Sequence, residues 1–213
     1  RQAAIGPMLV GRELEELCWE LVTMDDPRLT AYPDWLKQFR DFAWSDLDSL
    51  TMHKSARIER TEKGFQICIY NRTDYDELLA GLEQQGLSLP TADEWAYLCG
   101  GGCRTLFPWG DGMDYSIHLH HFESPEDEDK PFDMEEPNFF GLSIAYDPYM
   151  REVVKAEQFT TCGGDGGRSI CGGLGIFLGF LPCSPHCKPE VQEDKELNGD
   201  YDFYRSVIRV DVI

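Results

Sequence analysis

Residues 89–111 read LPTADEWAYLCGGGCRTLFPWGD, and this stretch predicts a short helix that leads into a rigid aromatic turn. The Leu-Pro pair favours an extended entry, because the proline ring fixes its own φ and keeps the preceding residue out of the α region. Thr91 and Glu94 have the spacing of a capping box at a helix N-terminus. Glycines 100–102 end the helix, and FPWGD at 107–111 follows as the turn.

The order and spacing of these residues resemble the central signature of the formylglycine-generating enzyme (sulfatase-modifying factor) family, which has a variant C-type-lectin fold. The resemblance covers roughly Arg57 to the end of the chain. It implies an irregular, mixed α+β fold of that type, as a domain spanning residues 56–213. Three later segments resemble further blocks of the family: PNFFGL at 137–142, GGRSIC at 166–171 and VIRV at 207–210.

Residues 1–55 lie outside the resemblance and predict an N-terminal helical region. One helix is predicted by apolar residues at i, i+3, i+4 and i+7, and a second by a similar pattern after Pro33. The apolar face of this region is expected to pack on its own domain, with docking to a larger partner as the alternative. The two sets of apolar residues are Leu14, Leu17, Cys18 and Leu21, and then Trp35, Leu36, Phe39 and Phe42.

The residues between these two regions predict a hairpin followed by a helix. Alternation over residues 56–70, with Glu62-Lys63-Gly64 in the middle, is typical of two half-buried strands and a turn. A helix is then expected from about Asp74, and Gly86 ends it.

Composition limits the partners of this chain. Its 213 residues carry 39 acidic against 19 basic side chains, a formal charge of −20, which argues against nucleic acid or an anionic membrane surface as the partner. The charge is compatible with a basic partner, or with a role in solubility alone. No apolar run has the length of a membrane span and no signal-peptide pattern is found, so we expect a cytoplasmic location. The sequence begins at Arg1 rather than Met, which leaves an upstream signal or domain open.

Eight cysteines allow three interpretations: a structural zinc site, one or more disulfides, or free thiols. Two pairs with three intervening residues could together supply four thiolates to zinc, although two intervening residues is the commoner spacing. Cys18 and Cys68 fall at apolar positions and are expected to be buried thiols. The candidate zinc ligands are Cys99, Cys103, Cys183 and Cys187.

Between residues 111 and 138 the chain contains histidines and a strongly acidic run. In the IHLHH segment, strand alternation would place His118 and His120 on one face, with His121 beside them. These histidines are candidate binding residues, either for a metal or as part of an exposed strand. The acidic run at 123–136 is typical of a solvated loop.

The resemblance also implies a calcium site after the PNFFGL block, where family members have a Gly-Asn-Val-x-Glu-Trp segment. The corresponding residues here are YDPYMREV at 146–153. Asp147 and Glu152 could supply oxygen ligands, but the family's asparagine is missing and the spacing differs. Calcium or zinc are therefore the candidate cofactors.

The resemblance extends to only one of the two cysteines that bind copper in the family. In the family, two nearby cysteines bind copper(I) and activate oxygen to oxidise a substrate cysteine to formylglycine, and soft thiolates suit that ion. Cys171 matches the first cysteine by its context, and it is the candidate catalytic residue. The expected position of its partner is near Ile176, which cannot bind a metal.

Two functions follow as hypotheses. The favoured one is a non-catalytic module that binds a protein or peptide through the loops at 118–138 and 162–187, with Asp165 and Arg168 as further binding residues. The alternative is a divergent copper- or iron-dependent oxidase, in which Cys171 works with Cys183, Cys187 or the histidines. An enzymatic role is the less expected of the two.

Overall fold

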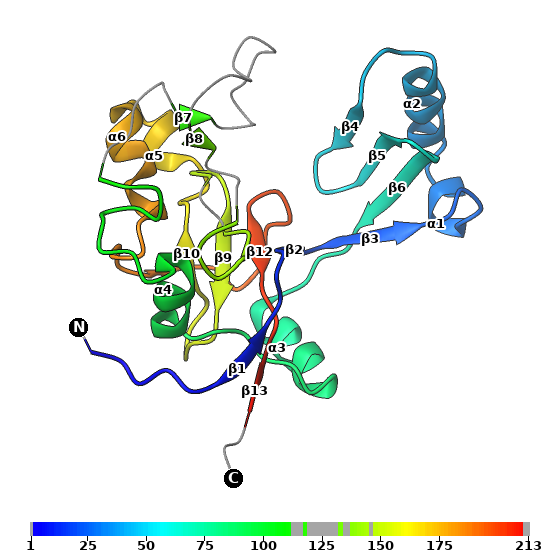
Figure 1. The fold of residues 1–213 in the computed structure, drawn as a ribbon. Helices are drawn as coiled ribbons and strands as arrows, with labels where there is room; N and C mark the ends of the chain where they lie inside the picture. The colour runs from blue at the N-terminus through cyan, green and yellow to red at the C-terminus, as the bar shows by residue number, and fades with distance from the viewer. Residues whose placement is uncertain (1, 112–116, 119–131, 134–136, 145–146, 211–213) are drawn as a thin grey trace. The chain divides into compact units, whose positions relative to one another are not determined.

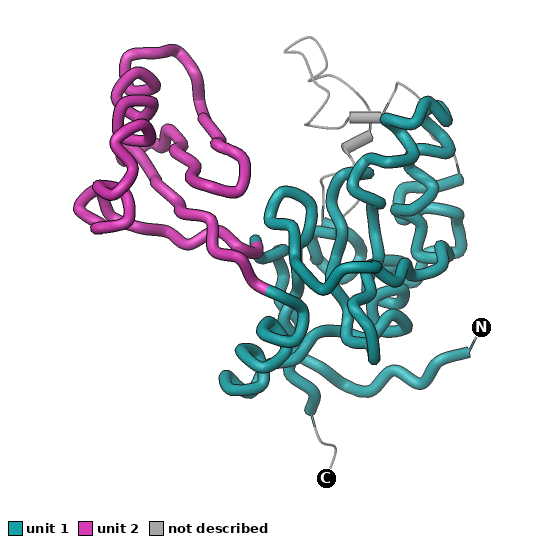
Figure 2. Tube along the Cα trace, turned by 180° about the vertical axis from the view of Figure 1, so that it is seen from behind, with its two compact units in different colours: residues 1–16, 74–213 teal, residues 17–73 magenta. Residues whose placement is uncertain are grey.

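The computed structural model describes residues 2–111, 117–118, 132–133, 137–144 and 147–210. It has a mixed α+β fold with several sheets, as the sequence predicts at that level (Figure 1). The chain forms two compact units, one made of residues 1–16 and 74–213 and the other of residues 17–73 (Figure 2). We call them unit 1 and unit 2.

Unit 1 is built on a five-stranded sheet in the order β11-β10-β9-β12-β2. The central hairpin of β9 and β10 is antiparallel, whereas β12 runs parallel to β9. A separate antiparallel pair joins β1 and β13, which lie side by side in Figure 1. The strands are β1 (Met8–Val10), β2 (Glu15–Glu16), β9 (Arg151–Val154), β10 (Thr160–Gly163), β11 (Glu190–Val191), β12 (Asp202–Tyr204) and β13 (Val207–Arg209), with a short parallel pair of β7 (Ile117–His118) and β8 (Phe132–Asp133).

The helix α4 (Ala92–Gly100) confirms the prediction from residues 89–111. Its capping box is complete: Glu94 N donates to Thr91 Oγ1 at 3.2 Å, and Thr91 N donates to the Glu94 carboxylate at 2.7 Å. Gly101 ends the helix at φ 55°, a left-handed conformation that suits glycine. The aromatic turn is also confirmed, because the Phe107 and Trp109 rings stack with their centroids 4.7 Å apart.

The other helices of unit 1 precede α4 or follow β10, and those after β10 lie in or next to the glycine-rich segment, which is GGDGGRSICGGLG at 163–175. The predicted helix after Asp74 is confirmed as α3 (Tyr75–Gln84), with Asp74 as its cap. The segment after β10 forms α5 (Arg168–Cys171), α6 (Gly175–Phe180) and the 3-10 turn η3 (Leu181–Cys183). In Figure 1, α5 and α6 lie together beyond the end of β10.

A buried arginine joins distant segments of unit 1. Arg205 and Glu152 are each 1% exposed, and the guanidinium donates to the Glu152 carboxylate at 2.9 Å. The same guanidinium donates to the main-chain oxygens of Gly11 at 2.6 Å and Arg12 at 2.7 Å, and also to that of Ser143. One side chain therefore satisfies carbonyls from two loops and neutralises a carboxylate of β9.

Unit 2 is a four-stranded antiparallel sheet in the order β3-β6-β5-β4, with two helices. The predicted hairpin at 56–70 is confirmed as β5 and β6, and the helix predicted after Pro33 is confirmed as α2. Phe39 and Phe42 of α2 pack in a cluster with Ile58 and Ile67 of the hairpin. The elements are β3 (Trp19–Val22), α1 (Pro27–Thr30), α2 (Pro33–Ala43), β4 (Ser49–Met52), β5 (Ala56–Thr61) and β6 (Gly64–Tyr70).

The first predicted helix, over Leu14 to Leu21, is wrong. The chain forms β2, then the strand β3, which pairs with β6 in the register Leu21↔Cys68. Cys18 has φ 67°, which interrupts any helix between the two strands, and Leu21 is exposed on β3 rather than sharing a buried face with Leu17. The predicted boundary between residues 55 and 56 falls at the turn of the β4–β5 hairpin, inside unit 2.

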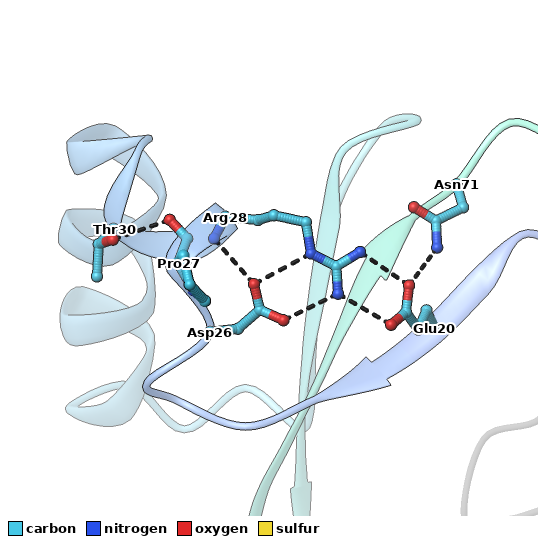
Figure 3. A network of polar contacts seen from close by, with 6 residues as sticks. All are labelled: Glu20, Asp26, Pro27, Arg28, Thr30 and Asn71. Carbon is cyan, nitrogen blue, oxygen red and sulfur yellow. Dashed lines mark hydrogen bonds and ion pairs between the residues drawn. The ribbon is translucent and has the colours of Figure 1, made fainter.

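A network of charged side chains joins three parts of unit 2 (Figure 3). Arg28 of α1 forms ion pairs at 2.8 Å with Glu20 of β3 and with Asp26, the cap of α1. Asn71, just after β6, donates to the Glu20 carboxylate as well. These hydrogen bonds, with that of Arg28 the largest cause, lower the pKa of Glu20 to about 2.

Candidate functional site

Unit 1 contains a cavity of about 760 Å³ beside the glycine-rich segment. Its walls come from β10, the loop that follows it, α5, and the residues that lead from η3 into β11. The apolar part of the lining is made by Trp95, Leu174, Pro182, Pro189 and Val191, and the polar part by Asp165, Arg168, Ser169, Lys188 and Glu190. The cavity thus combines an apolar surface with charged groups of both signs.

The loop that shapes the cavity is held by hydrogen bonds to Pro148. The amides of Asp165 and Gly167 donate to its carbonyl oxygen at 3.0 and 2.9 Å. Gly164 lies against the same segment, and a Cβ at this position would be 2.5 Å from the carbonyl oxygens of Asp147, Pro148 and Met150. Only glycine therefore fits this position without a shift of the main chain.

Asp165 is the buried charged residue of the cavity lining. It is 8% exposed, and its Oδ2 accepts hydrogen bonds from the amide and the hydroxyl of Ser169 at 3.0 and 2.5 Å. Its Oδ1 is buried and has no hydrogen-bond partner among the residues that the structure describes. One half of the carboxylate thus fixes the start of α5, and the other half is left unused.

Arg168 and Glu190 form the polar edge of the cavity. The Arg168 guanidinium pairs with the Glu190 carboxylate, and its Nε donates to the main-chain oxygen of Asp165 at 3.1 Å. The hydrogen bond to Glu190 is the main cause that raises the pKa of Arg168. The predicted binding residues Asp165 and Arg168 are therefore brought together, although their side chains do not pair with each other.

Sequence reasoning missed Glu190. It lies 22 residues from Arg168, and the pairing of β11 with β10 brings it to the cavity. No motif marks it, since an isolated Lys-Pro-Glu sequence predicts neither a strand nor a contact. The same strand pairing places Val191 in the lining of the cavity, where its side chain is exposed.

The predicted zinc ligands do not form a metal site in the part of the chain that the structure describes. No group of three or more His, Cys, Asp or Glu side chains is arranged there to hold a metal ion. All eight cysteines are free thiols, so no disulfide is formed. Cys99 and Cys183 are fully buried, and burial raises the pKa of both thiols well above the ordinary value. Cys187 lines the cavity, and Cys103 is partly exposed.

The two predicted calcium ligands have other partners. Glu152 is paired with Arg205 in the interior, and burial raises the pKa of its carboxyl group while Arg205 opposes this shift. Asp147 accepts a hydrogen bond from Tyr149 N at 2.7 Å. Among the described residues, neither belongs to a group of side chains placed to bind a cation.

Cys171, the candidate catalytic residue, is exposed at the end of α5. Its Sγ lies 3.3 Å from the hydroxyl of Tyr149, and this contact is the main cause that raises the pKa of Tyr149 to about 12. Ile176, at the expected place of a second ligand, lies in α6. Cys183, in contrast to Cys171, is buried.

The predicted histidine cluster is only partly within the described residues. The backbone of His118 lies in β7, whereas His120 and His121 lie outside the described residues. Most of the acidic run at 123–136 also lies outside them, apart from β8.

Comparison with other proteins does not place the chain in a family. No protein-family model matches the sequence, and no curated protein matches it either. None of the helices in the described residues combines the length and the apolar character needed to cross a membrane.

Proposed function

We propose that this chain is a non-catalytic binding module on a scaffold like that of the formylglycine-generating enzymes, with the related C-type-lectin fold. The cavity next to the glycine-rich segment holds a segment of a protein or peptide partner. The observation that carries the proposal is the lining of this cavity, which combines apolar side chains with the buried carboxylate of Asp165, one of whose oxygens has no hydrogen-bond partner in the described residues. Sites of this kind bind ligands through apolar contact and a few placed polar groups.

The frame around the cavity supports this role. The loop at 163–167 is fixed by hydrogen bonds to Pro148, and α5 is fixed by Asp165, so the cavity walls are held before a ligand arrives. A preformed site loses less conformational entropy on binding. The sequence signatures at 89–111, 166–171 and 207–210 support the choice of scaffold.

A peptide selection tests the proposal. The purified protein is immobilised, a random peptide library is selected on it, and the dissociation constants of the selected peptides are measured by fluorescence polarisation. Val191→Trp places a large ring in the cavity lining and is expected to weaken the binding of these peptides at least tenfold. Ile208→Trp is the matched control, because Ile208 is also an exposed aliphatic residue of a strand and does not line the cavity.

Two results would contradict the proposal. One is a selection that gives no peptide with saturable binding to the wild-type protein. The other is a set of peptides that bind the Val191→Trp variant as tightly as they bind the wild type.

The exposed thiol of Cys171 favours a second candidate, a copper- or iron-dependent oxidase acting on a protein cysteine. In this case Cys171 is a metal ligand, and it binds copper(I) as a soft thiolate. Copper(I) bound stoichiometrically by the wild-type protein and lost in Cys171→Ser would favour the oxidase over the binding module. Binding that is equal in both proteins would remove Cys171 from any such mechanism.

A further inference from the structure

The unused oxygen of Asp165 defines what a ligand must bring to the cavity. The residue is 8% exposed, and a buried acceptor without a donor destabilises the protein. Ser169 already occupies Oδ2 with two hydrogen bonds, whereas Oδ1 has no partner in the described residues. Oδ1 has almost no accessible surface in this conformation, so a ligand donor reaches it only after the carboxylate turns toward the cavity, and the new hydrogen bond then removes this penalty.

The neighbouring cations do not neutralise this carboxylate through a direct contact. The Arg168 guanidinium pairs with Glu190 and donates only to the main-chain oxygen of Asp165. Lys188 also lines the cavity, but its side chain is exposed. Because Arg168 pairs with Glu190, no cationic side chain in the described residues donates a hydrogen bond to the Asp165 carboxylate.

We infer that Asp165 receives the cationic end of a lysine or arginine side chain from the partner. This inference rests on the proposed function and names the residue class that the cavity selects. The apolar lining, which includes Leu174 and Val191, suits the methylene groups of such a side chain. The formal charge of −20 on the whole chain attracts a basic partner during the encounter.

Three small probes of similar size test the inference without a selected peptide: the N-acetylated amides of lysine, arginine and norleucine. Each is titrated into the labelled wild-type protein, and the amide chemical shifts of Gly163 and Ser169 are followed by NMR. The lysine or the arginine probe is expected to saturate these shifts, and norleucine is expected to bind at least tenfold more weakly. The comparison between lysine and arginine shows which cation the cavity prefers.

Substitution of the carboxylate provides the second test. Asp165→Asn is expected to weaken the cationic probe at least tenfold, while Glu157→Gln, at the far end of the β9–β10 hairpin, leaves it unchanged. The inference is overturned if norleucine binds as tightly as the cationic probes, or if a folded Asp165→Asn variant binds them as the wild type does. The probe comparison uses only the wild-type protein, so it decides the question even where Asp165→Asn does not fold.

The two tests separate this inference from the proposed function. Selected peptides that lack basic residues but lose affinity in Val191→Trp would keep the binding module and overturn the role of Asp165. If no peptide is selected and no probe binds, both the binding module and the role of Asp165 are overturned.

Discussion

Gly164 shows how one residue without a side chain fixes the loop beside the cavity. Three carbonyl oxygens, from Asp147, Pro148 and Met150, lie 2.5 Å from the position where a Cβ would be. They belong to the main chain, so they cannot turn away as the end of a flexible side chain could. The close approach therefore depends on glycine at this position.

Gly164→Ala is expected to destabilise the protein by about 1–3 kcal/mol, the usual cost of overpacking a rigid site. Urea unfolding measures the change. Gly81→Ala is the control, because Gly81 lies inside α3 and a Cβ there would have no atom within 4 Å. The control is expected to stabilise the protein by about 0.5–1 kcal/mol, since alanine favours a helix interior. Equal effects of the two substitutions would contradict the steric argument.

Cys171 differs from the other cysteines in its exposure, and this predicts selective reactivity. Five of the other thiols are buried, while Cys103 and Cys187 are partly exposed. A thiol reagent added to the native protein is expected to modify one cysteine in a fast phase, and Cys171→Ser is expected to abolish that phase. The remaining thiols should react after denaturation. A fast phase that persists in Cys171→Ser would show that another thiol is the accessible one.

At the scale of elements, the network around Arg28 predicts a pH dependence for the contact between β3 and α1. The pKa of Glu20 is about 2 in the folded protein, against an ordinary value of 4.5. A carboxyl group whose pKa is lower in the folded state stabilises that state above its unfolded pKa. This contribution is lost as the pH falls from about 4.5 through 2.

NMR titration of the Glu20 side-chain carboxyl carbon measures this pKa directly. In Arg28→Met the midpoint is expected to rise toward the ordinary range, because the ion pair and its hydrogen bonds are removed. Asn71→Ala is expected to produce a smaller rise, since Arg28 is the larger cause of the shift. A midpoint that does not change in Arg28→Met would contradict the network.

Some of these elements can be predicted from the sequence, and others cannot. The start and end of α4 depend on Thr91, Glu94 and Gly101, which lie within a few residues of one another, so a local pattern predicts them. The strand β3 depends on pairing with β6, which lies far along the chain, and Leu21 gives no local sign of it. The residues around Cys18 therefore read as a helix although they form two strands.

The candidate site likewise contains residues that the sequence marks and residues that only the fold brings together. Arg168 lies in the GGRSIC segment at 166–171, whose resemblance to a known signature marks it, and Asp165 lies directly before that segment; both line the cavity. Glu190 reaches Arg168 only through the pairing of two strands, which the sequence of that region does not reveal. The pairing of Glu152 with Arg205 could not be foreseen for the same reason, and it gives a predicted calcium ligand another role.

In the whole molecule, unit 2 is an insertion in the sequence of unit 1, and we expect that it can be removed without unfolding unit 1. Unit 2 occupies residues 17–73 within the sequence of unit 1, and its two ends are joined by a hydrogen bond of 2.7 Å from Asn71 N to Cys18 O. The two ends of unit 2 thus lie next to each other. Unit 2 also has its own buried cluster, with Leu29, Phe39 and Ile58 among its members.

Replacement of residues 17–73 by a short Gly-Ser linker is therefore expected to leave unit 1 folded. The measurement is an NMR comparison of the deleted protein with the full chain, in which the amide shifts around Gly163 and Ser169 should agree. Binding of the lysine probe to this shortened protein should also match that of the full chain. Loss of dispersed amide signals from unit 1 would contradict the division.

Arg205 has a consequence for the kinetics of folding. Its guanidinium contacts Gly11, Arg12, Ser143 and Glu152, which are separated from it by between 53 and 194 residues in the sequence. Contacts between residues so far apart require the closure of long loops, and the entropy of that closure is lost before the contacts stabilise the chain. We therefore expect the guanidinium to reach its partners after the folding barrier has been crossed. Substitutions of Arg205 should then accelerate unfolding much more than they slow refolding.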